Sequence, residues 1–250
     1  MRLTRFPHEF EALLSERGRR VLAGADGGVL GRQKFFSDEG LLERELVEDC
    51  TAILTKTFTD LLVELTEPLP SATASLLPYG ERLPKVARML AVPTGHTTTT
   101  EQYQRGEACG LIPMLHSESY RAFVAALAGL RVDGPQHMQV FCYRPGDYAG
   151  PHTDHRPDNE RMYDGYFDVH LTFCTAGVTD QLIIYERDGH LTEQRSIGKT
   201  GTVTAYRLPF WHYTTPLQAT GPQARRWLVL GTFFESLRPR SAVESTPAPP

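Results

Sequence analysis

The sequence is poor in the features that mark secreted, membrane-spanning and nucleic-acid-binding proteins. It has four cysteines in 250 residues and no Cys-x-x-Cys pair, which excludes a zinc ribbon or a dense disulfide framework. No apolar run approaches the ~20 residues that span a bilayer, and the N-terminus has no apolar signal core. A net charge of -4 argues against a nucleic-acid surface built on bulk positive charge. We therefore expect a cytoplasmic protein with neither a membrane nor a nucleic-acid partner.

The composition is that of a globular protein. Hydrophobic residues make up 40% of the chain and charged residues 22%. We find no internal repeat and no division into two domains. We expect one domain over residues 1–235, with a helical part at 1–135 and a β-rich core at 136–235. The Pro-rich end, 236–250, is expected to be disordered.

The N-terminal half carries helical periodicity. Apolar residues recur every three or four positions from Leu46 to Leu65, which predicts a helix over 38–65, with Ser37 as its cap and Pro68 beyond its end. A second helix is predicted over 117–130, and short helices at 9–16 and 86–92. Residues 68–85 and 93–110 are predicted loops. The second loop is a plain connector or a substrate lid, with Tyr103 and Arg105 as its contacts.

The pattern changes after residue 130. Short runs typical of strands recur at 138–143, 166–174, 181–186, 200–207 and 226–234, separated by turn residues. Many short strands with turn signals favour a β-sandwich or barrel. The N-terminal helices are expected to pack on the outside of this β-core.

Residues 141–154, FCYRPGDYAGPHTD, end in a candidate metal-binding pair. In an extended segment, His152 and Asp154 point to the same side and are separated by about 7 Å. One imidazole and one carboxylate then face a common point, and a further histidine would complete a two-His, one-carboxylate site for non-haem Fe(II). Because the chain has nine histidines, this short motif carries little weight without its surroundings.

Those surroundings resemble the 2-oxoglutarate- and Fe(II)-dependent dioxygenases, most closely the prolyl-hydroxylase-type branch. The resemblance covers residues 138–235. It is carried by a strand ending in Tyr143, the Pro145-Gly146 turn, the His152/Asp154 pair, a distal His212, and a basic residue that opens the next strand. It implies a mainly β protein with a double-stranded β-helix, or jelly-roll, core and flanking helices.

The third ligand has two candidates. His212 follows a strand-like run and precedes a Pro-Leu turn, as the distal histidine of the family does. His170 is closer in sequence and would share a strand face with Asp168 and Thr172. No Arg opens an apolar strand soon after His170, so we assign His212 to the metal and place His170 near the cosubstrate.

The cosubstrate contact is expected at Arg226. Arg225 and Arg226 point to opposite sides of an extended strand, so one of them faces inward. A buried guanidinium is costly unless it is paired, and it matches a carboxylate in a two-pronged way. The family pattern of Arg followed by an aromatic residue fits Arg226-Trp227, although the alternative that both arginines lie at the surface stays open. The Tyr143 hydroxyl is a second candidate contact.

The resemblance implies an enzyme that uses Fe(II), 2-oxoglutarate and dioxygen. It would couple oxidative decarboxylation of 2-oxoglutarate to oxidation of a C–H bond, with hydroxylation as the main expectation and desaturation or cyclisation as alternatives. Family members that halogenate carry a small residue where Asp154 stands. The expected substrate is a small amino-acid-derived or natural-product molecule. The polar segment 155–165 either contacts it through Arg156 or Arg161 or is a solvated loop, which is the commoner case for a charge-rich run. A zinc enzyme or a non-catalytic jelly roll remains the rival interpretation.

Overall fold

The computed structural model describes residues 2–24, 27–68, 86–93, 98–154 and 166–236. The predicted loop at 68–85, the polar segment 155–165 and the C-terminal tail therefore fall almost wholly outside the described residues. Within the described part, none of the helices has the length and apolar character needed to cross a membrane.

A large antiparallel sheet forms the body of the molecule. Its strand order is β1-β10-β6-β13-β4-β3-β2, and β5 pairs with β3 beside this path. The strands are β1 (Phe35–Asp38), β2 (Val63–Pro68), β3 (Val86–Ala91), β4 (His137–Tyr143), β5 (Tyr148–Ala149), β6 (Tyr166–Cys174), β10 (Val203–Arg207) and β13 (Arg226–Phe234).

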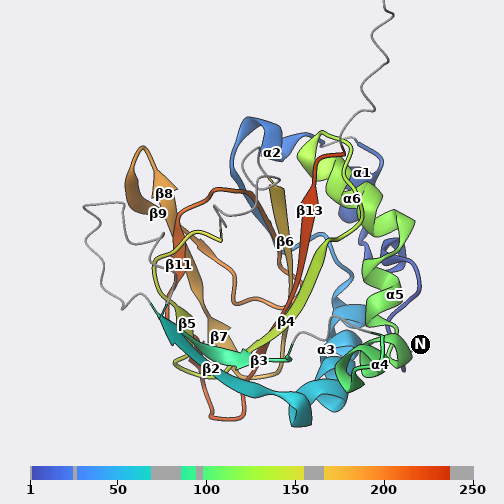
Figure 1. Cartoon of the computed structure of the whole chain (residues 1–250), viewed down its shortest axis with the longest axis vertical. Coiled ribbons are helices and arrows are strands. Elements are labelled where there is room, and N and C mark those ends of the chain that lie inside the picture. Colours follow the sequence, from blue (N-terminus) through green and yellow to red (C-terminus); the bar gives the residue numbers. More distant parts are fainter. Residues whose placement is uncertain (1, 25–26, 69–85, 94–97, 155–165, 237–250) are drawn as a thin grey trace, which may run out of the picture.

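Two smaller antiparallel units face this sheet. One has the order β11-β8-β9, with β8 (Leu182–Arg187), β9 (His190–Ser196) and β11 (His212–Thr214), and the other pairs β7 (Val178–Asp180) with β12 (Gln218–Ala219). The curled large sheet and the smaller sheet opposite it make the expected jelly-roll-like core, so the predicted fold class is confirmed (Figure 1).

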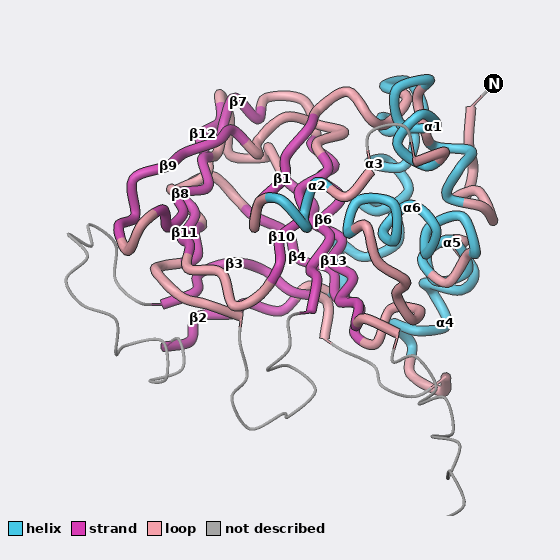
Figure 2. The backbone as a smooth tube through the Cα atoms, turned by 90° about the horizontal axis from the view of Figure 1, so that it is seen from above, coloured by secondary structure: helices cyan, strands magenta, loops and turns pink. Residues whose placement is uncertain are grey.

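Most of the helices lie together on one side of the large sheet. In both views α1, α4, α5 and α6 sit beyond β6 and β13, on the side away from β8, β9 and β11 (Figure 1, Figure 2). They are α1 (Glu16–Leu22), α2 (Val29–Arg32), α3 (Arg44–Phe58), α4 (Glu101–Ala108), α5 (Leu111–Leu115) and α6 (Glu118–Ala128), with 3-10 turns at Phe10–Leu13 and Thr59–Leu61.

The central strands β6 and β13 are buried on both faces. On the outward face, Phe173 of β6 and Trp227 and Val229 of β13 join the hydrophobic cluster that includes the helices. The indole Nε1 of Trp227 donates to Thr55 Oγ1 at 3.1 Å, which ties α3 to the sheet. Because successive side chains alternate, the residues between these point to the opposite face, where the functional cavity lies.

The long helix predicted over 38–65 is shorter than its apolar pattern suggests. Residues 35–38 pair as β1 with β10, so Ser37 lies in a strand and does not cap a helix. The helix begins at Arg44 and ends at Phe58, and Leu65 lies on β2. Leu61 lies in the 3-10 turn that follows the helix, whereas the helical spacing of Leu65 is a coincidence that the pairing of β2 with β3 overrides.

Two other local predictions were wrong. Residues 86–91 of the helix predicted over 86–92 form β3, because pairing with β2 and β4 decides the state of an apolar run that is too short for its periodicity to settle. Residues 101–108 form α4, and Thr100 caps it by accepting from the Tyr103 N–H. Arg105 pairs with Asp60 and Glu101, so it holds α4 in place and does not line the cavity.

The predicted helix at 117–130 and the Pro-Gly turn both occur. Ser117 caps α6 by accepting from the Tyr120 N–H, and Gly129 ends it in the left-handed conformation. Gly146 has a φ of 84°, which suits the third position of a tight turn after Pro145, and the Asp147 N–H donates to the Arg144 carbonyl at 2.9 Å.

Gly198 allows the chain to pass close to the start of β8. A Cβ at this position would lie 2.4 Å from the Gln181 nitrogen, a backbone atom that cannot move independently. We expect Gly198→Ala to destabilise the protein by about 1 to 3 kcal/mol through overpacking, measured as a lower midpoint of thermal unfolding. Gly221→Ala is the control, because a Cβ there meets no atom within 4 Å. Equal stability of the two variants would contradict this explanation.

Candidate metal and anion site

A short antiparallel contact brings His152 and His212 together. The His152 N–H donates to the His212 carbonyl at 2.9 Å, and the His212 N–H returns the bond at 3.0 Å. Their ring centroids are 4.4 Å apart. Residues 60 positions apart in the chain are thus held as direct cross-strand neighbours, which fixes both imidazoles by backbone pairing.

Asp154 completes a cluster of three ligand atoms. The ligand atoms of His152, Asp154 and His212 all lie within 4.8 Å of one another. Asp154 Oδ1 lies 3.3 Å from His152 Nε2, and its Oδ2 lies 3.8 Å from His212 Nε2. Both histidines are buried and Asp154 is half-buried. The structure therefore brings together the three residues that the motif and its surroundings selected.

The backbone sets the orientation of both imidazoles. His152 Nδ1 lies 2.6 Å from the Gly150 carbonyl and His212 Nδ1 lies 3.0 Å from the Phe210 carbonyl. A carbonyl oxygen only accepts, so each Nδ1 carries the proton and each Nε2 presents its lone pair toward Asp154. Two imidazole nitrogens and one carboxylate oxygen on one side of a cavity fit an Fe(II) ion that keeps open positions, and also fit zinc.

The charges in this cluster perturb one another. Burial opposes the charged form of His152, but Asp154 outweighs it and raises the pKa of His152. Burial, followed by the neighbouring His152, lowers the pKa of His212 to about 4. Although burial opposes it, the two imidazoles lower the pKa of Asp154. The cluster is thus arranged for a positive charge beside Asp154.

Arg226 is the second unusual feature of the same cavity. Its side chain is 1% exposed at the start of β13, and no carboxylate of the described residues lies within ion-pair distance. It donates to the Ile197 carbonyl at 3.0 Å, to Gln181 Oε1 at 3.1 Å and to Thr172 Oγ1 at 3.1 Å. Burial lowers the pKa of Arg226, which is the expected effect of a buried cation without an anion.

Of the residues next to Arg226, Arg225 points away from the cavity, as strand alternation requires, and Tyr143 on the paired strand lines it. The Arg225 guanidinium folds back on its own turn and donates to the Pro222 and Ala224 carbonyls. The Tyr143 ring lies beside Arg226, with its centroid 5.2 Å from the guanidinium carbon, and burial raises the pKa of Tyr143 to about 12. Tyr143 and Arg226 therefore form one end of the cavity, and Arg225 does not reach it.

His170 lies in the cavity but outside the three-residue cluster. Its Nε2 is 3.1 Å from the Tyr206 hydroxyl, which donates to Asp154 Oδ2 at 3.0 Å. Burial lowers the pKa of His170 to about 3, so the ring is neutral at physiological pH. Tyr206 was not predicted from the sequence, because no local pattern in a strand shows which of its residues will contact Asp154 from a distant segment.

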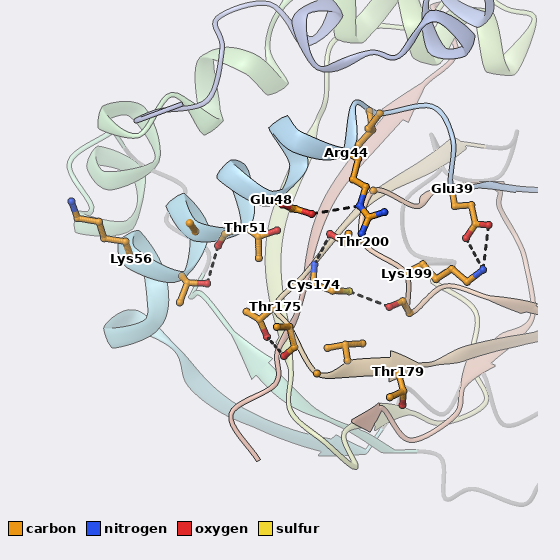
Figure 3. A pocket seen from close by; sticks show the side chains of 18 residues that line it. Glu39, Arg44, Glu48, Thr51, Lys56, Cys174, Thr175, Thr179, Lys199 and Thr200 are labelled. Atoms are coloured by element: carbon orange, nitrogen blue, oxygen red, sulfur yellow. Dashed lines mark hydrogen bonds and ion pairs between the residues drawn. The ribbon is translucent and has the colours of Figure 1, made fainter. Parts of the chain in front are cut away.

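One cavity of about 650 Å³ contains all of these groups. It is lined by the His152–Asp154–His212 cluster, by Arg226 and Tyr143, and by His170, Tyr206, Asp168 and Thr204. A larger cavity of about 1090 Å³ lies between α3 and the turns at 174–179 and 198–201 (Figure 3). Its charged pairs Arg44–Glu48 and Lys199–Glu39 are already matched. The smaller cavity is therefore the candidate functional site.

Comparison with known proteins places the fold. No family model and no curated protein sequence matches the chain. Among solved structures, it is similar to an oxidoreductase of the 2OG-Fe(II) oxygenase family from Burkholderia pseudomallei, at 12% identity and a TM-score of 0.52 over 84% of this chain and 90% of that one. It is also similar to the epimerase SnoN, in complex with Fe3+, alpha ketoglutarate and nogalamycin RO, at 12% identity and a TM-score of 0.52 over 91% and 93% of the two chains.

These similarities agree with the strand order and with the cluster of His152, Asp154 and His212. The chain has the fold of the 2-oxoglutarate- and Fe(II)-dependent oxygenases, and a His-x-Asp…His cluster lies within it.

Proposed function

We propose that this protein is an Fe(II)- and 2-oxoglutarate-dependent oxygenase that oxidises a C–H bond of a small molecule, most simply by hydroxylation. One observation carries the proposal: a two-His, one-carboxylate cluster and a buried arginine with no acidic partner among the described residues line the same cavity. A zinc hydrolase or a plain binding module has no need of the second feature.

His152, Asp154 and His212 would hold the iron. Bound iron and 2-oxoglutarate would together supply the electrons that activate dioxygen, which no side chain of the protein provides. The protein fixes the ligands: the Gly150 and Phe210 carbonyls hold the two imidazoles, and the Tyr206 hydroxyl holds Asp154. Such supporting contacts set ligand orientation and basicity.

Arg226 would bind the distal carboxylate of 2-oxoglutarate. A guanidinium has five N–H donors, and the contacts to Ile197, Gln181 and Thr172 use one on each of its three nitrogens. One N–H then remains on each terminal nitrogen, which is the number that a two-pronged contact with a carboxylate needs. Gln181 is itself held by the Thr215 carbonyl at 2.9 Å, so the arginine is fixed before the cosubstrate binds.

The experiment that tests this function is dioxygen-dependent formation of succinate from 2-oxoglutarate, measured by mass spectrometry with Fe(II) in the absence and presence of candidate substrates. We expect succinate with Fe(II) and none with Zn(II). The mass of the product then separates hydroxylation, which adds one oxygen atom, from desaturation, cyclisation or epimerisation, which add none. A metal-loaded protein that makes no succinate under any of these conditions would support the zinc or binding-module interpretation.

The Tyr206 hydroxyl offers a test of the supporting contacts. We expect Tyr206→Phe to weaken Fe(II) binding by about 10- to 100-fold, because Asp154 loses the donor that orients it. Anaerobic metal titration measures this effect directly. Tyr185→Phe is the matched control, since Tyr185 belongs to the same aromatic group but is not bonded to a member of the triad. Similar metal affinity in both variants would mean that Tyr206 only fills space.

A further inference from the structure

Asp168 is a buried acid with no cationic partner in the described structure. Its side chain projects from β6 into the cavity that holds the triad, and the residue is 2% exposed. Thr232 Oγ1 donates to its Oδ1 at 2.6 Å, and no Lys, Arg or His of the described chain forms an ion pair with it. Burial, and then the nearby Asp154, raises the pKa of Asp168. The other carboxyl oxygen has no partner among the described residues and is left for a ligand.

Thr204 is a second incomplete polar group in the same place. Its Oγ1 is fully buried and has no hydrogen-bond partner. Thr204 lies opposite His170 in the register between β10 and β6, and Tyr206, two residues on, lies opposite Asp168. Thr204 and Asp168 are thus diagonal neighbours on two paired strands, and both line the cavity.

A buried polar group without a partner costs free energy in the free protein. Within this cavity the cost falls on Asp168 and Thr204, next to the residues that support the metal. Proteins keep such groups where a ligand completes their hydrogen bonds, so the incomplete pair indicates a ligand position distinct from that of Arg226.

The sum of the charges in the site, with Fe(II) and 2-oxoglutarate bound, indicates the charge of the ligand that Asp168 would take. This step rests on the proposed function. The two positive charges of Fe(II) and the one of Arg226 are balanced by Asp154 and the two carboxylates of 2-oxoglutarate. Asp168 is then the acid left without compensation, and a buried carboxylate is stable when a cation pairs with it.

We propose that Asp168 and Thr204 form the recognition subsite for the substrate and that the substrate carries an amino group. The ammonium donates to the free oxygen of Asp168, and the Thr204 hydroxyl makes the second contact. Along β6, Asp168 is about 7 Å from His170, whose ring contacts Tyr206 beside the triad. A small amine held there has its carbon atoms between this subsite and the metal.

Stability provides a test that needs no substrate. A purely structural role for these two groups requires that Asp168→Asn and Thr204→Val lower the midpoint of thermal unfolding. The proposed role requires that both substitutions leave the midpoint unchanged or raise it. Asp168→Asn removes the buried ionisable acid but keeps an oxygen that accepts from Thr232, and Thr204→Val removes a hydroxyl that has no partner. A clear decrease in both variants would overturn the subsite.

Binding of matched probes provides the second test. Benzylamine, benzyl alcohol and benzoate share one ring and differ in the polar group, and their NMR line broadening by Mn(II) in the anaerobic, 2-oxoglutarate-loaded protein reports binding near the metal. We expect benzylamine to bind most tightly and benzoate least. Asp168→Asn should weaken benzylamine binding at least tenfold and leave the affinity for 2-oxoglutarate unchanged.

The controls distinguish a failure of the amine subsite from a failure of the proposed oxygenase function. Asp188→Asn removes an acid that is exposed at a hairpin tip and should change nothing. Wild-type protein that binds Mn(II) and 2-oxoglutarate but prefers benzoate, or binds none of the three probes, contradicts the subsite and leaves the proposed function standing. Wild-type protein that binds neither the metal nor 2-oxoglutarate contradicts both.

Discussion

The protein in which His212 is replaced by Ala is expected to form no more succinate than the wild-type protein without iron. His212 is the one triad member from the second half of the core, and its Nε2 is positioned by the backbone contact with His152 and by the Phe210 carbonyl. Alanine at this position leaves two ligands, one of them a half-buried carboxylate. Succinate formation and anaerobic Fe(II) titration should both report the loss.

His190→Ala is the matched control for this experiment. His190 begins β9, is exposed and lies outside the candidate cavity. It should keep full activity and metal affinity. The assignment of the third ligand would be wrong if His212→Ala retained wild-type affinity for Fe(II), and His170→Ala would then be the next variant to measure, since His170 is the rival nearest the cluster.

The protein in which Arg226 is replaced by Ala is expected to bind 2-oxoglutarate at least about 30-fold more weakly. Removing one partner of a buried, hydrogen-bonded charge pair costs about 2 to 5 kcal/mol, and 1.4 kcal/mol is a tenfold change in affinity. Arg226→Lys should recover only part of the loss, because an ammonium is a point charge and cannot make the two-pronged contact. The dissociation constant from anaerobic titration is the measurement.

Arg225→Ala controls for the change of net charge. Its guanidinium contacts only the carbonyls of its own turn, so the affinity for 2-oxoglutarate should stay at the wild-type value. Arg226→Ala also strips Gln181 and Thr172 of a partner, so circular dichroism must show that the variant is folded. A folded Arg226→Ala protein with wild-type affinity for 2-oxoglutarate would contradict the proposal that Arg226 binds this cosubstrate.

The sequence was most informative where the fold is decided by short-range patterns. The Pro145-Gly146 turn and the same-side placement of His152 and Asp154 follow from local geometry and period-two alternation. Alternation also required one of Arg225 and Arg226 to face inward, and the family resemblance selected Arg226, which is the buried one. The strand runs predicted at 138–143, 166–174, 181–186, 200–207 and 226–234 correspond to β4, β6, β8, β10 and β13, whereas β9 and the short strands β5, β7, β11 and β12 were not predicted.

Predictions failed where distant pairing decides the structure. β1, β2 and β3 come from the part of the chain that was expected to be helical, yet they join the large sheet through partners such as β10 and β4. Their apolar runs are too short to distinguish a strand from a helix, and only the presence of a free sheet edge settles the question. The loop-like composition of 93–110 likewise gave no indication of α4, which Thr100 caps.

For the supporting residues of the site, the sequence predicted the strand face on which they lie but not the side chains that they contact. Alternation along β6 predicted that Asp168, His170 and Thr172 lie on one side of the strand. Asp168 and His170 do line the same cavity. That Thr172 and Gln181 hold Arg226, and that Tyr206 holds Asp154, depends on which strands become neighbours. Such contacts join residues from 45 to 54 positions apart, beyond the reach of any local pattern.

The most direct measurement of the central claim is the visible absorption spectrum during anaerobic addition of Fe(II) and then 2-oxoglutarate. A weak charge-transfer band should appear only when both are present, because it requires 2-oxoglutarate to chelate an iron held by His152, Asp154 and His212. Protein that binds Fe(II) at this cluster and shows no such band at saturating 2-oxoglutarate would contradict the account.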